Sequence, residues 1–157
     1  MLIGCPTEIK PQEFRVGLTP GAVSELIARG HKALIQSGAG LGAGFTDADY
    51  LAVGADIAPD ATTVFDRADM VVKVKEPQPV ERAMLRRGQV LFTYLHLAPD
   101  PDQTRELLES GVTAIAYETV TDERGGLPLL APMSEVAGRL SIQAGATALQ
   151  KANGGRG

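Results

Sequence analysis

The chain has 157 residues, with 15 Lys and Arg against 19 Asp and Glu, so its formal net charge is −4. Its composition, 44% apolar and 22% charged, is typical of a folded single domain and argues against disorder. The weakly acidic charge argues against nucleic acid and against an anionic membrane as partners. One cysteine excludes an internal disulfide and a cysteine-based metal site. Neither a signal peptide nor an apolar run of the roughly 20 residues that span a bilayer is visible, so we expect a cytoplasmic chain.

Short apolar runs alternate with helical patterns along the whole chain. The pattern predicts strands at 2–5, 31–36, 70–75, 89–97 and 112–117. It predicts helices from Thr19-Pro20 to Gly30, from Thr46 to about Val53, at 79–87, from Pro101 to Gly111, and from Met133 to about Lys151. Such an alternation is typical of right-handed βαβ units. We therefore expect a doubly wound α/β fold with a mostly parallel sheet and helices on both faces.

A glycine-rich segment, SGAGLGAGF at 37–45, follows a predicted strand and precedes a predicted helix. It contains G-x-G-x-x-A, which is a feature of dinucleotide-binding turns. Two observations weaken that interpretation. The loop before Thr46 is too long for a tight turn, and Asp47 and Asp49 place carboxylates where a phosphate would sit. A structural loop is the competing interpretation.

Three side chains that suit an anionic ligand fall where predicted strands end. Arg15 lies in the loop after the first strand, Lys75 ends the strand at 70–75, and His96 lies near the end of the strand at 89–97. Each has an ordinary structural interpretation by itself. In an open parallel sheet, however, the carboxyl ends of the strands share one edge, where ligands bind. Two cations and one titratable base at this edge suit a small oxo-acid.

Lys73 lies two residues before Lys75, which puts both lysines on one face of the predicted strand. Two lysines in a strand that should be buried on both faces are unusual. Either the side chains reach solvent or Glu76, or they serve a site.

Several motifs follow one another over essentially the whole chain: GCPTEIK at 4–10, EFRVGLTP at 13–20, SGAG at 37–40, VKVKEP at 72–77, LFTYLHL at 91–97, AIAYETV at 114–120 and LLAPMSEVAGR at 129–139. Together they resemble the N-terminal part of L-alanine dehydrogenases. The resemblance implies an enzyme that converts L-alanine, water and NAD to pyruvate, ammonia and NADH. It also implies a homo-oligomer, which is a hexamer in full-length members of the family.

The resemblance assigns a role to individual residues. It implies that Arg15 and Lys75 bind the carboxylate and oxo group of the substrate, and that His96 is the acid and base at the carbonyl oxygen. Met133 and Ser134 match a segment that lines the crevice between the substrate and the nicotinamide. The glycine-rich loop is then structural, because the dinucleotide fingerprint of the family lies in a later domain.

The resemblance also implies a domain organisation. We expect residues 1–150 to form the substrate-binding domain and residues 151–157 to begin a linker to an NAD-binding domain that is absent. Such a truncated chain should have no dehydrogenase activity by itself, because hydride transfer needs a positioned nicotinamide. Two alternatives remain open. One is the related domain of a nicotinamide nucleotide transhydrogenase, a family that does not carry the Tyr94-Leu95-His96 segment. The other is a truncated gene product that acts as a non-catalytic interaction domain.

Overall fold

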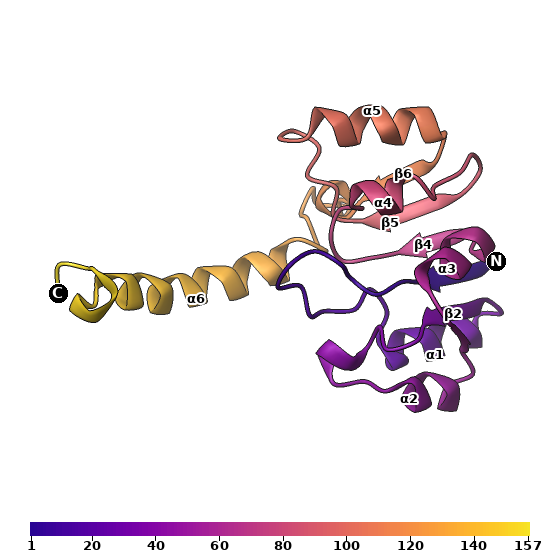
Figure 1. Ribbon diagram of the computed structural model, residues 1–157, viewed down its shortest axis with the longest axis horizontal. Helices are drawn as coiled ribbons and strands as arrows, with labels where there is room; N and C mark the ends of the chain where they lie inside the picture. The colour runs from indigo at the N-terminus through magenta and orange to yellow at the C-terminus, as the bar shows by residue number, and fades with distance from the viewer. The chain divides into compact units, whose positions relative to one another are not determined.

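The computed structural model describes residues 1–157, which form two compact units, Met1–Ala116 and Tyr117–Gly157. The first unit contains a six-stranded sheet in the order β3-β2-β1-β4-β5-β6 (Figure 1). Its strands are β1 (Leu2–Cys5), β2 (Lys32–Gln36), β3 (Asp56–Ala58), β4 (Met70–Val72), β5 (Val90–Thr93) and β6 (Thr113–Ala116). Every neighbouring pair of strands is parallel. The prediction of a doubly wound α/β fold is confirmed.

The helices of the first unit connect these strands: α1 (Pro20–Ala28), α2 (Asp47–Ala52), α3 (Ala61–Arg67), α4 (Pro79–Arg82) and α5 (Pro101–Ser110). Their ends follow the sequence signals. The Thr19 side chain accepts a hydrogen bond from the Ala22 N–H at the start of α1, and Thr46 and Asp49 form a capping box on α2. Gly111 ends α5 in the left-handed conformation with φ +70°.

The core lies on both faces of the sheet because side chains alternate along each strand. On one face, residues of β1 and β2 such as Cys5 and Ile35 pack with Val23 of α1 and Tyr50 of α2. On the other face, Phe65 of α3 and Leu107 of α5 belong to the same cluster as residues of β4 and β5. Both faces of the strands are therefore buried, as parallel sheets require.

The strand order places a topological switch point between β1 and β4. From β1 the chain proceeds to β2 and β3 on one side, and it then returns to the other side of β1 as β4. The connections that follow β1 and β4 consequently lead to strands on opposite sides of this point. In folds of this kind a ligand binds at that point, outside the carboxyl ends of the strands.

Some predicted boundaries are wrong. The predictions contained neither β3 nor α3, two short elements in a polar stretch that lacks a clear apolar period. The strand predicted at 70–75 ends at Val72, and the one predicted at 89–97 runs only from Val90 to Thr93. The helix predicted at 79–87 is the single turn α4. The residues predicted to extend these strands belong instead to the loops at the carboxyl edge of the sheet.

The second unit contains a turn closed by the Asp122 side chain and the long helix α6 (Ala131–Leu149). Single 3-10 turns precede and follow it, at Tyr117–Thr119 and Lys151–Asn153. The prediction of a helix from Met133 to about Lys151 is therefore confirmed to within two residues at each end. None of the helices is long and apolar enough to cross a membrane.

Candidate functional site

The loop that carries Arg15 crosses the carboxyl end of β4. The evidence is Gly17, whose absent side chain allows a close approach: a Cβ atom there would lie 2.7 Å from the Val72 carbonyl oxygen and 3.0 Å from the Lys73 Cα. Only glycine permits this contact without displacing backbone. The loop between β1 and α1 thus brings Arg15 to the segment that contains Lys75.

Glu13 holds the Arg15 side chain in a bidentate ion pair. Arg15 Nε donates to Glu13 Oε1 at 2.8 Å, and Arg15 Nη2 donates to Glu13 Oε2 at 2.6 Å. The Arg15 backbone N–H also donates to Glu13 Oε1, at 2.9 Å. The Arg15 hydrogen bonds hold the pKa of Glu13 below its ordinary value, and in return Glu13 raises the pKa of Arg15. This pairing fixes the plane of the guanidinium.

Lys75 follows β4 and is half-buried. The Glu8 carboxylate accepts from its backbone N–H at 3.4 Å, and the Thr93 hydroxyl donates to its backbone carbonyl at 2.8 Å. The Lys75 ammonium is also one of the charges that lower the pKa of Glu13, after the larger effect of Arg15. Both cations therefore act on the Glu13 carboxylate, Arg15 through a direct ion pair and Lys75 through a weaker electrostatic effect.

His96 lies three residues beyond β5, in the loop at the same edge of the sheet. Its backbone has φ +48°, the left-handed region that non-glycine residues rarely adopt. The His96 ring is stacked on the Tyr94 ring, with centroids 5.7 Å apart and planes at 7°. Burial tends to raise the pKa of Glu76, but its pairing with Lys10 and the nearby His96 leave that pKa below its ordinary value.

The structure thus places Arg15, Lys75 and His96 in the loops that follow β1, β4 and β5. These strands are neighbours in the sheet. Met133 and Ser134 lie in the first turn of α6, in the second unit. Their part in a site stays a prediction.

A buried charge cluster at the same edge was not predicted from the sequence. Lys73 Nζ lies 3.2 Å from Glu8 Oε2 and 2.7 Å from Glu81 Oε1, and each of the three side chains is at most 2% exposed. Burial raises the pKa of Glu81, although Lys73 opposes that effect. The one signal of this cluster in the sequence was a lysine in an apolar strand. Its partners lie eight and 65 residues away in sequence, so no local pattern identifies them.

The glycine-rich segment does not form a dinucleotide cradle. The Asp47 carboxylate accepts from the Gly38 N–H at 2.8 Å and from the Ser37 hydroxyl at 2.7 Å, so a carboxylate occupies the donors that a pyrophosphate would need. Close packing against neighbouring residues explains why glycine occupies these positions. A Cβ atom at Gly40 would lie 2.7 Å from the Tyr50 ring, and one at Gly42 would lie 2.7 Å from the Phe14 carbonyl oxygen.

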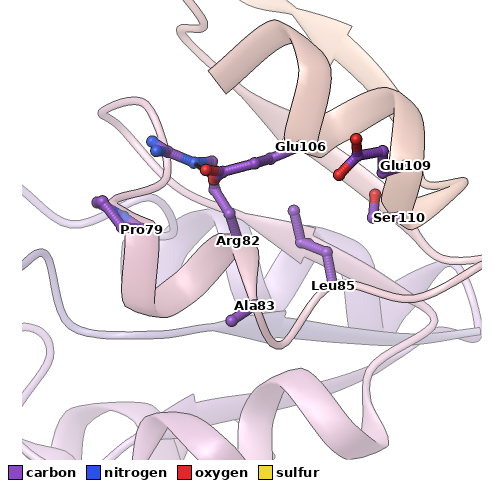
Figure 2. A pocket seen from close by; sticks show the side chains of 7 residues that line it. All are labelled: Pro79, Arg82, Ala83, Leu85, Glu106, Glu109 and Ser110. Carbon is purple, nitrogen blue, oxygen red and sulfur yellow. Dashed lines mark hydrogen bonds and ion pairs between the residues drawn. The ribbon is translucent and has the colours of Figure 1, made fainter. Parts of the chain in front are cut away.

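A pocket of about 360 Å³ between α4 and α5 lies apart from the predicted site residues, none of which lines it (Figure 2). Arg82 is its main polar group. It pairs with Glu106 and donates to the Pro77 carbonyl at 3.0 Å, so it fastens α4 to α5 and to the loop that precedes α4. No group of three or more His, Cys, Asp or Glu is arranged to hold a metal ion.

Comparisons with known proteins give the family that the sequence motifs resemble. The family model "Alanine dehydrogenase/PNT, N-terminal domain" matches residues 4–137. The alanine dehydrogenases of Halomonas elongata and Bacillus subtilis are 56% and 57% identical over all 157 residues, which cover 42% and 41% of those proteins. The chain therefore spans about two-fifths of the length of these relatives.

Solved structures agree with this result. An L-alanine dehydrogenase superposes with a TM-score of 0.91 at 54% identity over all of this chain and 43% of that one. A transhydrogenase from Sinorhizobium meliloti superposes less closely, with a TM-score of 0.71 at 26% identity over 75% of this chain and 34% of that one. The transhydrogenase alternative therefore has less support. The chain belongs to the alanine dehydrogenase/PNT N-terminal domain family.

Proposed function

We propose that this chain is the substrate-binding part of an NAD-dependent L-alanine dehydrogenase, which converts L-alanine, water and NAD to pyruvate, ammonia and NADH. One observation carries the proposal: the Arg15 loop crosses the end of β4 at Gly17, so that Arg15, Lys75 and His96 belong to loops at one edge of the sheet, after the neighbouring strands β1, β4 and β5. The proposal is supported by relatives named alanine dehydrogenase that match the entire chain.

Arg15 and Lys75 bind the substrate in this proposal. A guanidinium has five N–H donors, more than the bidentate pair with Glu13 uses, and a lysine ammonium is a point charge that suits the oxo group as well as the carboxylate. Glu13 balances one of the two positive charges. The other positive charge is left to attract a monocarboxylate such as pyruvate.

His96 is the acid and base at the carbonyl oxygen in this proposal. In the direction of alanine formation it gives a proton to that oxygen, and in the direction of pyruvate formation it takes the proton back. Its ring is held by the stack on Tyr94. A fixed ring orients the proton before the substrate arrives, which lowers the entropic cost of reaching the reactive geometry.

NAD, when bound, supplies the hydride acceptor. The glycine-rich segment does not fit its pyrophosphate, because Asp47 occupies the Gly38 N–H. We propose that Met133 and Ser134 face the nicotinamide, as the resemblance implies, and that this chain holds little of the rest of the cofactor. We also propose that it works in a homo-oligomer.

The proposal is tested by titrating the 15N-labelled 157-residue chain with pyruvate and following amide chemical shifts. We expect saturable shifts at Arg15, Lys75 and His96, no NADH turnover by this chain, and loss of the shifts in Arg15→Ala. The matched control Arg29→Ala removes an exposed arginine at the C-terminal end of α1 and should bind pyruvate normally. Absence of any saturable shift in the wild-type chain would overturn the proposal.

A further inference from the structure

The buried cluster of Glu8, Lys73 and Glu81 contacts the backbone of the proposed substrate-binding lysine, because Glu8 accepts from the Lys75 N–H. Buried ion clusters contribute little to stability, because the cost of removing charges from water offsets their attraction. Apolar residues of similar size would fill the same space at lower cost. The position of the cluster therefore suggests a role other than stability.

Glu8 binds three successive residues of the segment that contains Lys75. Its Oε1 atom accepts from the Val74 N–H at 2.6 Å and from the Lys75 N–H at 3.4 Å, and its Oε2 atom lies 3.2 Å from Lys73 Nζ. Glu8 follows β1, which ends at Cys5. Its carboxylate thus replaces β1 as the hydrogen-bond partner of the chain beyond β4.

The opposite side of this segment is bound by the chain that ends β5. The Lys73 N–H donates to the Phe92 carbonyl at 3.1 Å, and the Tyr94 N–H donates to the Val74 carbonyl at 3.2 Å. The Thr93 side chain, which is fully buried, continues this ladder by donating its hydroxyl to the Lys75 carbonyl at 2.8 Å. A side chain takes the place of a backbone donor at the last step.

The far end of the segment is fixed as well. Glu81 accepts from the Gln78 N–H at 2.8 Å and pairs with Lys73 at 2.7 Å, which ties α4 back to the start of the loop. The Gln78 side chain donates to the Glu76 carbonyl at 3.0 Å. The backbone on both sides of Lys75 is consequently held, while its side chain extends from a fixed base.

We propose that Glu8 and Thr93 are positioning residues for the substrate: they hold the N–H and the carbonyl of Lys75, so that the strands on both sides of β4 set the place of its ammonium. This inference rests on the proposed function. A lysine side chain has several rotatable bonds, and its reach is defined only if its backbone is fixed. Small displacements of a binding group reduce binding and catalysis strongly.

Thr93→Val tests the carbonyl side, because valine keeps the shape of threonine and removes the hydroxyl. We expect the dissociation constant of pyruvate for the 157-residue chain to rise at least about fivefold. Thr93→Ser restores the donor and should return the constant to within about twofold of wild type. The matched control Thr104→Val removes another hydroxyl that donates to a backbone carbonyl, that of Asp100, and should leave pyruvate binding unchanged.

Glu8→Gln tests the N–H side with a readout that needs no ligand. We expect faster hydrogen exchange of the Val74 and Lys75 amides relative to the amides of the β4–β5 ladder, because an amide oxygen is a weaker acceptor than a carboxylate. The positioning role would be overturned if Thr93→Val bound pyruvate as tightly as the wild-type chain. It would also be overturned if amide exchange were unchanged in a folded Glu8→Gln variant. A wild-type chain that binds no pyruvate would instead overturn the proposed function, and the exchange measurement would still decide whether Glu8 holds the segment.

Discussion

The ring of His96 lies flat on the ring of Tyr94, with the centroids 5.7 Å apart and the planes within 7° of parallel. Side chains two residues apart on an extended chain share one face, which allows the two rings to lie near each other. The backbone of His96, however, has a φ of +48°, in the left-handed region. A non-glycine residue costs about 1–2 kcal/mol in this conformation. The geometry that orients the imidazole is therefore maintained against a local preference of the chain.

A pair of substitutions at His96 measures this backbone strain. His96→Gly and His96→Ala both remove the imidazole and its stack, but glycine adopts a positive φ without the steric cost that alanine meets. We expect the glycine variant to be more stable by about 1 kcal/mol in urea unfolding of the 157-residue chain. Equal stability of the two variants would mean that the segment relaxes to a negative φ when the ring is removed.

The sequence was sufficient to predict features that depend on local signals. Pro20 and Gly30 enclose α1, Pro101 and Gly111 enclose α5, and both helices form where these residues predict them. Arg15, Lys75 and His96 could be assigned to one edge because parallel strands end on the same side of a sheet. That argument needs only the order of elements along the chain.

Features that depend on contacts between distant segments could not be predicted. The partners of Lys73 are Glu8 and Glu81, and no spacing rule connects a glutamate after the first strand to a lysine 65 residues later. The Thr93 hydroxyl bond to Lys75 requires the register of β4 and β5. β3 and α3 escaped detection because their apolar residues are too few to show a period.

Gly17→Ala should displace the Arg15 loop. A Cβ atom at this position would meet the Val72 carbonyl oxygen at 2.7 Å, and backbone atoms cannot move aside as a flexible side chain can. We expect a loss of about 1–3 kcal/mol in the free energy of unfolding, measured by thermal or urea denaturation. Gly21→Ala is the matched control: its Cβ would lie 3.9 Å from the Thr19 hydroxyl oxygen, an ordinary contact, and alanine favours the helix α1. Similar losses for both variants would contradict the close approach of the loop to β4.

The ion pair between Glu13 and Arg15 predicts a pH dependence of stability. Because the folded chain lowers the pKa of Glu13 from its ordinary 4.5, the stabilisation is fully present above pH 4.5 and is lost as the pH falls through the lower folded value. Glu13→Gln should therefore lose stability relative to wild type near neutral pH and approach it in acid. The measurement is urea unfolding between pH 3 and pH 7. Glu25→Gln, which removes an exposed carboxylate near Arg29, controls for the change in net charge.

The single cysteine should be inert in the folded chain. Cys5 is fully buried in β1, and burial raises the pKa of its thiol to about 11, so very little reactive thiolate exists at neutral pH. We expect a disulfide reagent to modify it only as fast as the chain unfolds, and immediately in strong denaturant. Rapid modification of the native chain at pH 7 would show that the first strand opens locally.

Two lysines that lie two residues apart should respond in opposite ways to the same change. Lys73→Met leaves the buried carboxylates of Glu8 and Glu81 without a cation, and removing one partner of a buried ion pair typically costs about 3–5 kcal/mol. Lys75→Met removes a half-buried ammonium, which should change the free energy of unfolding by less than about 1 kcal/mol and abolish pyruvate binding.

Urea unfolding and the pyruvate titration, applied to both variants, separate the two roles. Since methionine retains most of the lysine volume, loss of packing cannot account for the difference. A folded Lys73→Met variant with wild-type stability would contradict this expectation and would mean that the Lys73 ammonium contributes nothing to stability.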